Sequence, residues 1–239
     1  MTTDYGVTIT SSAVAGMTAG LNLLIYGLAG AGKTYLAKTT GDLEHTLVVA
    51  AEPGLLTLRD VEIPVVRVDA LDTMQRIYRM LRDSEHGFRW VIIDSISEVA
   101  EAVLNEEKAR QKDGRKAYGE LADRLTSLIK AFRDLPIHVV MIAKQERVQD
   151  DDGRLLYGAS FPGRKLTQDV PYYFDEVLAL RAEEDTDAAG AIVVRRFLQA
   201  QPDGRYLAKD RSGALEMFEA PSLSHIAEMI LGEGVDSDE

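Results

Sequence analysis

The 239-residue sequence contains no cysteine. This absence excludes disulfide bonds and thiolate metal sites, and it fits a reducing compartment such as the cytoplasm. No stretch approaches the ~18 apolar residues that a membrane-spanning helix requires. The first 20 residues lack the basic start of a secretion signal. We therefore expect a cytoplasmic protein that does not partner with a membrane.

Basic residues are outnumbered: 27 Lys and Arg stand against 39 Asp and Glu, for a formal net charge of −12. This balance argues against a surface coated for nucleic acid, although it leaves room for a local basic groove. The four histidines are scattered and lack metal-ligand spacing. No repeat or low-complexity linker marks a second domain. We predict one domain over residues 1–239, with its core at about 20–231 and an acidic, disordered tail at 232–239.

Residues 27–34 match the phosphate-binding loop pattern G-x-x-x-x-G-K-[ST] at every required position. The glycines let the backbone turn tightly, so that successive N–H groups point at phosphate oxygens. Lys33 is expected to reach the β- and γ-phosphates, and the Thr34 hydroxyl is expected to bind Mg²⁺. The predicted nucleotide site consists of Tyr35 and the loop residues Gly27, Leu28, Ala29, Gly30, Ala31, Gly32, Lys33 and Thr34.

Strand-like and helix-like segments alternate along the chain. Apolar runs predict strands at 21–26, 46–51, 63–68, 90–94 and 137–143, and helical spacing predicts helices at 34–40, 72–82, 96–109, 120–133 and 222–231. Near-continuous apolar strands between helices indicate a mainly parallel sheet that is covered on both faces. Two later strands, at 174–180 and 191–198, are expected to add antiparallel edges. We predict a three-layer α/β fold.

Polar residues follow the predicted strands where a ligand would meet them. Asp94 ends an apolar strand, which is the pattern of a carboxylate that holds Mg²⁺. Because Ser95 follows it, and not a second carboxylate, the catalytic base must lie elsewhere. Glu52 and Glu98 are the two candidates. We favour Glu52 because the carboxyl ends of parallel strands meet at one edge of the sheet. Gln145, which follows the next strand, is predicted to sense the γ-phosphate.

The order of these elements resembles the RecA-like recombinase core. Within that superfamily the chain most resembles small phage proteins known as RecA-like single-strand annealing proteins or phage nucleotide-binding ATPases. The resemblance spans about residues 20–231. Four segments carry the closer likeness: Tyr-Gly at 118–119, Phe-Pro-Gly-Arg-Lys at 161–165, Phe-Asp-Glu-Val at 174–177 and Ala-Lys-Asp-Arg-Ser-Gly at 208–213.

The resemblance implies ATP and Mg²⁺ as cofactors, Glu52 as the catalytic carboxylate and Gln145 as the phosphate sensor. It also implies that Lys209 and Arg211 reach the γ-phosphate of a neighbouring subunit in a homo-oligomer, either a ring or a filament. The alternative for this pair is a solvated turn. Relatives often place an aromatic residue after the catalytic glutamate to stack on adenine. Here Arg59 is expected to stack by its guanidinium plane.

Two basic stretches lie where the RecA-like family places its DNA-binding loops. The first contains Lys108, Arg110, Lys112, Arg115 and Lys116. The second contains Arg147, Arg154, Arg164 and Lys165, with the interleaved aromatics Tyr157 and Phe161 and the acidic triplet 150–152. Basic residues with nearby aromatics suit single-stranded DNA. The alternative for the first stretch is a solvated helix end.

These observations predict an ATPase that binds single-stranded DNA and promotes annealing or recombination, with a single-strand-binding protein as a possible further partner. If the protein is encoded by a phage, it acts in the host cytoplasm. Three alternatives stay open: a replication motor or helicase loader, a small-molecule kinase, and a nucleotide switch without catalysis. An Asp-Glu pair at 94–95 would favour the motor, and an acceptor pocket would favour the kinase.

Overall fold

The computed structural model describes Ser11 and residues 20–149 and 152–232. The predicted acidic tail lies outside the described residues after Gly232, and so do the first two residues of the acidic triplet 150–152. Within the described ranges, no helix has both the length and the apolar character needed to cross a bilayer.

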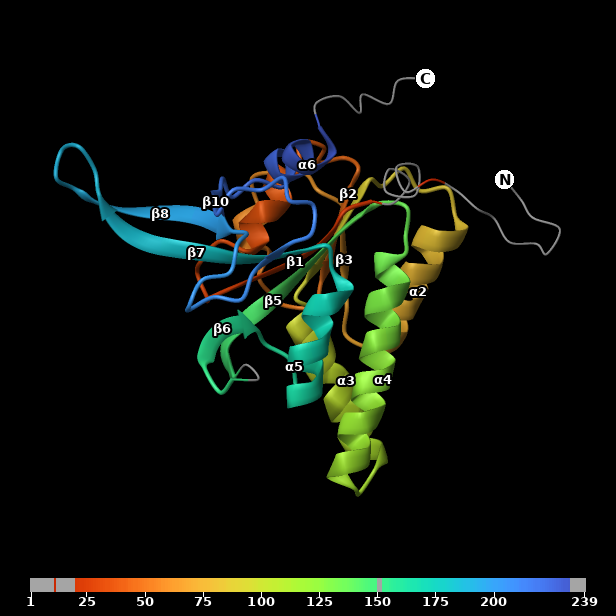
Figure 1. Cartoon of the computed structure of the whole chain (residues 1–239). Coiled ribbons are helices and arrows are strands. Elements are labelled where there is room, and N and C mark those ends of the chain that lie inside the picture. Colours follow the sequence, from red (N-terminus) through yellow and green to blue (C-terminus); the bar gives the residue numbers. More distant parts are fainter. Residues whose placement is uncertain (1–10, 12–19, 150–151, 233–239) are drawn as a thin grey trace.

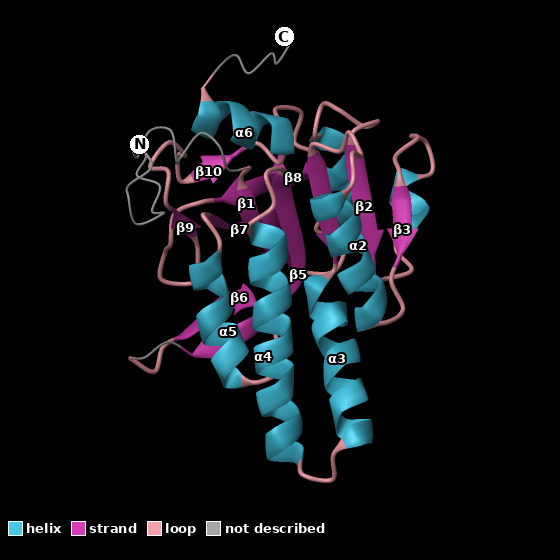
Figure 2. Cartoon of the chain, turned by 90° about the vertical axis from the view of Figure 1, so that its right-hand side faces the viewer, coloured by secondary structure: helices cyan, strands magenta, loops and turns pink. Residues whose placement is uncertain are grey.

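A ten-stranded sheet forms the middle layer (Figures 1 and 2). Its path runs β10-β8-β7-β1-β5-β4-β2-β3, and the pairs from β7 to β3 are all parallel. The parallel strands are β1 (Asn22–Gly27), β2 (Thr46–Ala50), β3 (Val65–Arg67), β4 (Trp90–Asp94), β5 (His138–Gln149) and β7 (Glu176–Thr186). The strand of the phosphate loop, β1, is separated from the strand of Asp94, β4, by β5.

Helices cover both faces of this sheet because the central strands are apolar on both sides. In β1, Leu24 and Tyr26 face one cluster of buried residues, while Leu23 and Ile25 face another. The first cluster is closed by α2 (Leu71–Asp83), α3 (Ile96–Arg110), α4 (Gly114–Arg133) and α5 (Arg164–Asp169) with the 3₁₀ helix η3 (Val170–Tyr173). The second is closed by the 3₁₀ helices η1 (Thr34–Thr39) and η2 (Leu55–Leu58) and by α6 (Leu223–Leu231).

Antiparallel strands extend the parallel core. β8 (Ile192–Gln199) pairs with β7, and the short β10 (Phe218–Glu219) pairs with β8. β9 (Lys209–Asp210) pairs with the beginning of β7, and β6 (Leu155–Ala159) pairs with the distal half of β5. The predicted three-layer α/β fold, with a mainly parallel sheet and antiparallel edge strands, is confirmed.

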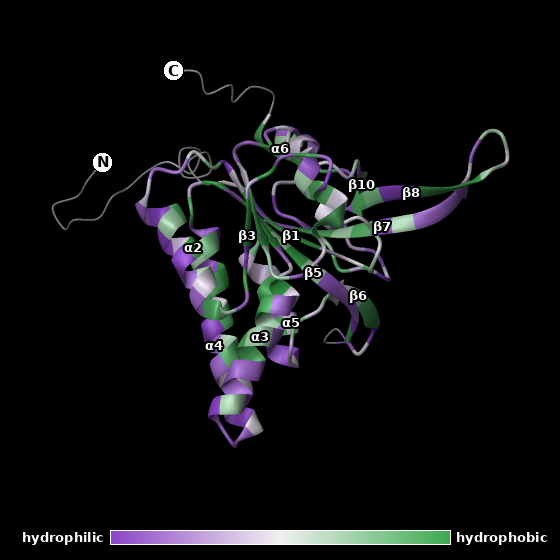
Figure 3. Ribbon diagram, turned by 180° about the vertical axis from the view of Figure 1, so that it is seen from behind, coloured by the Kyte–Doolittle hydropathy of each residue, from purple (hydrophilic) through white to green (hydrophobic). Residues whose placement is uncertain are grey.

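The helices α3 and α4 form a long hairpin that projects from the body of the molecule (Figures 1 and 2). Glu107 of α3 is buried and pairs with Arg124 of α4, which ties the two helices together. α4 begins at Gly114, six residues before the predicted start, because its first turns bury Ala117 against the core. The distal ends of both helices are hydrophilic (Figure 3).

Candidate active site

The phosphate loop connects the end of β1 to the start of η1, at the carboxyl edge of the sheet. Gly32 has φ 104°, a conformation that residues with a side chain rarely adopt. The segment after the loop is a 3₁₀ helix, whereas the sequence predicts an α-helix there. Leu36 and Ala37 of η1 are buried, so this short helix holds the loop against the second face of the sheet.

A cavity of about 580 Å³ opens beside the loop. This volume is within the usual range for a small-molecule site. Lys33 lies in it and donates to the carbonyl oxygens of Gly27 and Leu28, both at 2.9 Å. Burial lowers the pKa of Lys33, with Lys144 acting in the same direction and the carboxylates of Asp94 and Glu52 opposing it. The lining consists of Gly27, Leu28, Ala29, Gly30, Gly32, Lys33, Thr34, Tyr35, Glu52, Gly54, Thr57, Asp94, Lys144 and Gln145.

Thr34 and Asp94 form a pair of oxygen ligands at one side of this cavity. The Thr34 hydroxyl donates to Asp94 Oδ2 at 2.5 Å. Asp94 is 7% exposed, and burial raises its pKa, as does the nearby charge of Glu52; the hydrogen bond from Thr34 acts against this rise. A hydroxyl and a carboxylate are hard oxygen donors of the kind that Mg²⁺ prefers. The residues present therefore fit a magnesium ion bound together with a nucleotide.

Glu52 reaches the cavity from the turn after β2. Its Oε1 accepts a hydrogen bond from Ser95 Oγ at 2.5 Å, which fixes the carboxylate beside the Asp94–Ser95 turn. The second candidate base, Glu98, lies on α3 and forms an ion pair with Lys144. Glu98 does not line the cavity, whereas Glu52 does. The position of Glu52 thus suits the water-orienting role better than that of Glu98.

Gln145 lines the same cavity from the middle strand. β5 continues past it as the antiparallel hairpin with β6, an extension that the sequence analysis did not predict. The next residue, Glu146, accepts hydrogen bonds from Ser160 Oγ at 3.0 Å and from Thr167 Oγ1 of α5 at 3.3 Å. One continuous strand therefore connects the nucleotide cavity to α5.

Two basic residues near the loop escaped the sequence analysis. Lys144 lines the cavity and is held by Glu98. Arg196 of β8 donates from Nε to the carbonyl oxygen of Ala31 at 3.1 Å. Arg196 does not line the cavity, so it supports the loop from outside and attaches the β7–β8 hairpin to it. Only the long-range pairing of strands brings these side chains to the loop, and no local motif marks them.

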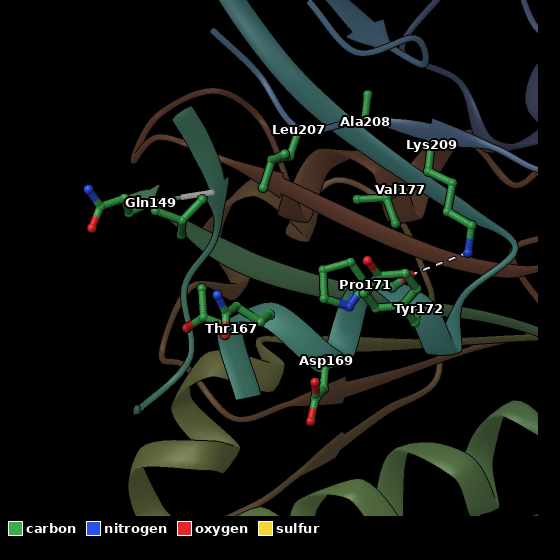
Figure 4. Close-up of a pocket in the computed structure, with 11 residues that line it drawn as sticks. Gln149, Thr167, Asp169, Pro171, Tyr172, Val177, Leu207, Ala208 and Lys209 are labelled. Carbon is green, nitrogen blue, oxygen red and sulfur yellow. Dashed lines mark hydrogen bonds between the residues drawn. The ribbon is translucent and has the colours of Figure 1, made fainter. Parts of the chain in front are cut away.

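Lys209 and Arg211 lie at the opposite edge of the sheet from the phosphate loop of the same chain. Lys209 stands opposite Val177 at the amino end of β7. Its amino group donates to the carbonyl oxygen of Pro171 in η3 (Figure 4) and to that of Phe174, the residue after η3. Arg211 pairs with Asp175 at 2.7 Å. Lys209 lines a second cavity of about 450 Å³, which Arg211 does not line, and within one chain neither residue lines the nucleotide cavity.

Arg59 is exposed at the end of η2 and does not line the nucleotide cavity. Tyr35 does line it, and its side chain is 52% exposed. Lys38 lies 5.2 Å from the centre of the Tyr35 ring. The exposed aromatic surface beside the loop is therefore that of Tyr35, which the sequence analysis included only through its position after Thr34.

The first basic stretch lies at the distal end of the α3–α4 hairpin. Its five basic residues are exposed, at the end of α3, in the turn and in the first turn of α4. Arg110 forms ion pairs with Glu106 and Glu107, so its charge is largely matched within the hairpin. Within the described part of the chain, no ion pair holds Lys108, Lys112, Arg115 or Lys116. We call these four residues the hairpin tip.

The basic residues of the second stretch lie in two elements, the β5–β6 hairpin and the start of α5. Arg147 lies over the Tyr157 ring in the β5–β6 hairpin, and exposed Arg154 precedes β6. Arg164 and Lys165 are exposed at the start of α5. The interpretation of Phe161 as an aromatic that contacts DNA is wrong, because it is 4% exposed and packs in the core. The backbone between β6 and α5 turns inward there, so the ring fills space under α5.

Comparison with known families agrees with this geometry. A model of the AAA domain family matches residues 19–212, which include the phosphate loop, Asp94 and both β-hairpins. A search of curated proteins finds no match.

Proposed function

The chain belongs to the AAA domain family, whose members are nucleotide-binding P-loop ATPases, and we propose that it hydrolyses ATP while bound to single-stranded DNA in order to promote annealing or recombination. The observation that carries the proposal is the position of α3. This helix begins at Ile96, directly after the carboxylate Asp94, and ends at the hairpin tip. The same proposal includes the resemblance to phage annealing proteins. It also includes the location that this resemblance implies for the protein, the cytoplasm of the phage's host.

The chemistry at the cavity follows from the residues that line it. Lys33 and the loop N–H groups bind the phosphates, and Thr34 and Asp94 hold Mg²⁺. The bound ion neutralises charge on the phosphates. Glu52 accepts a hydrogen bond from a water and orients it toward the γ-phosphate, while Ser95 holds the Glu52 carboxylate in place. Gln145 contacts the γ-phosphate from the middle strand.

The hairpin tip supports DNA as the partner. Its cations project from a protein whose net charge is −12, so they form a local basic site on an acidic surface. Long side chains at the end of a protruding hairpin reach a backbone phosphate without steric hindrance. Asp113 is occupied as the N-cap of α4, where it accepts from the Arg115 N–H at 2.9 Å. Its carboxylate is thereby held at the start of α4.

Removing three of the four cations of the hairpin tip should weaken binding to single-stranded DNA and reduce its dependence on salt. For the triple variant K112A/R115A/K116A we expect the slope of log Kd against log salt to fall by about 2, since each phosphate contact contributes about 0.7. Fluorescence anisotropy of a labelled oligonucleotide with ATP present gives this slope. The control variant R67A/R76A/R79A removes as many exposed charges from β3 and α2 and should bind as the wild type does. If the wild type shows no salt-sensitive binding, the DNA proposal is wrong.

We also propose that the site is completed by a neighbouring copy, through Lys209 and Arg211. In this assembly, the edge of the sheet that carries Lys209 and Arg211 in one subunit faces the phosphate loop of the next subunit. Their positive charge therefore reaches the γ-phosphate only in the oligomer. This role requires Lys209 to exchange its contacts with the Phe174 and Pro171 carbonyls for the nucleotide.

Mixing two inactive variants tests this arrangement. K33A lacks the loop lysine, and K209A lacks the cross-subunit lysine, so each alone should hydrolyse little ATP. In random mixtures about one interface in four joins an intact loop to an intact Lys209, and turnover should recover to about that fraction of wild type. If Lys209 acts only within its own chain, at the end of η3, mixing restores no turnover.

A further inference from the structure

A groove lies between α4 and α5 and contains Arg164 and Lys165 of the second basic stretch. Its volume is about 490 Å³. One wall contains Tyr118, Gly119 and Ala122 of α4, and the other contains Gly163, Arg164 and Lys165. We call it the α4–α5 groove. It is separate from the nucleotide cavity, and the two share no residue.

The groove is open because a glycine stands against the aromatic ring. Gly163 has φ 90°, and a Cβ atom there would lie 3.2 Å from Tyr118 Cδ1, so a side chain would press on the ring. With glycine in place, Tyr118 remains 43% exposed. At Gly119, on the same wall, a Cβ atom would meet nothing within 4 Å, so the space beside the ring is also free.

One cation lies over this ring, and two more line the groove. Lys108 Nζ lies 5.5 Å from the centre of the Tyr118 ring, and Arg164 and Lys165 are exposed on the opposite wall. In the ranges that the structure describes, no ion pair occupies any of the three. The groove contains one carboxylate, Asp123, so its charge is net positive.

An exposed aromatic ring among unpaired cations is the arrangement that binds a nucleotide of a single strand. We propose that the α4–α5 groove binds single-stranded DNA, with one base stacked on Tyr118 and the adjoining phosphates at Lys108, Arg164 and Lys165. This inference rests on the DNA binding proposed above, and it adds a base-contacting site to the hairpin tip. Because every base has a π-face, the site tolerates any sequence.

The groove is also connected to the nucleotide cavity. The Thr167 hydroxyl of α5 lies 3.0 Å from the carbonyl oxygen of Phe161 and 3.3 Å from Oε1 of Glu146, the residue after Gln145, and its single proton is shared between these two acceptors. A movement of Gln145 therefore acts on the segment that carries Gly163 and Arg164. Binding in the groove should accordingly depend on whether ATP occupies the cavity.

The test compares Y118A, Y118F and Y118L in binding to a labelled oligothymidine and to a matched abasic oligonucleotide, with ATP present. Stacking contributes about 1–3 kcal/mol per base, so Y118A should raise the Kd for oligothymidine about fivefold or more. Y118F keeps the ring and should bind as the wild type does. Y118L keeps the apolar contact with Gly163, preserving the fold, and should bind as weakly as Y118A. The variant Y172A, which removes a tyrosine that is 76% exposed elsewhere, serves as the control.

The abasic oligonucleotide separates stacking from a structural role, because all four proteins should bind it with equal affinity. If the wild type binds oligothymidine and Y118A and Y118L bind it equally well, the groove proposal fails while the DNA proposal stands. If no variant or wild type binds DNA at all, the proposed function itself fails. Tyr118-dependent binding of an acidic peptide, with DNA binding independent of Tyr118, would assign the groove to a protein partner and overturn the inference.

Discussion

Replacing Lys33 with alanine should abolish ATP binding at micromolar concentrations. The Lys33 ammonium is the only lysine of the loop, and it lies within the cavity beside the carbonyl oxygens of Gly27 and Leu28. Hydrogen bonds to charged groups contribute about 1.5–3 kcal/mol each, so losing two of them to phosphate weakens binding at least about 100-fold. Isothermal titration with a slowly hydrolysed ATP analogue measures this loss.

Lys38 provides the matched control for this substitution. It lies one turn further along η1, where it pairs with Asp60 and contacts the Tyr35 ring. K38A should keep nucleotide affinity within about threefold, because Lys38 does not line the nucleotide cavity. ATP binding by K33A as tight as by the wild type would mean that the loop does not bind phosphate in the manner described.

The substitution E52Q should stop hydrolysis and leave ATP binding intact. The amide keeps the shape of the carboxylate, and its oxygen still accepts from Ser95, but it cannot accept a proton from the attacking water. We expect turnover to fall by about 100-fold or more, which is the usual contribution of a general base. Phosphate release at saturating ATP gives the turnover, and the binding titration gives the affinity.

E98Q is the companion variant, because Glu98 is the other candidate base. Its carboxylate is paired with Lys144 and lies outside the cavity lining, so its loss should reduce turnover by only a few-fold. The opposite pattern, in which E98Q is inactive and E52Q is active, would assign the base to Glu98. ATP binding with no turnover in the wild type or in either variant would favour a nucleotide switch without catalysis.

The sequence allowed the central sheet to be predicted because its strands are continuous apolar runs beside clear turn signals. The predicted strand at 90–94 coincides with β4, and Ser222 is the N-cap of α6 as expected, accepting a hydrogen bond from the His225 N–H. The sequence also predicted that Lys33 and Asp94 lie in the same cavity, because parallel strands bring their carboxyl ends to one edge of the sheet.

Other features depend on tertiary contacts that no local pattern encodes. Gly114 and Gly119 disfavour a helix, yet α4 runs through both because Ala117 and Leu121 pack in the core. The distal half of β5, residues 144–149, is polar except for Val148, so it lacks the apolar pattern of a strand, and it is a strand because β6 pairs with it. Phe161 adjoins basic residues in sequence, but its ring lies under α5. The contact between Arg196 and Ala31 spans 165 residues.

The most direct test of the account is the rate of ATP hydrolysis by the wild-type protein as single-stranded DNA is added. We predict that the rate rises several-fold and saturates, and that the rise is absent from K112A/R115A/K116A. High salt should remove it as well, because the phosphate contacts of the hairpin tip are weakened by counterions. A hydrolysis rate that is the same with and without DNA, at low salt and with the fold intact, would contradict the link between the cavity and the hairpin tip.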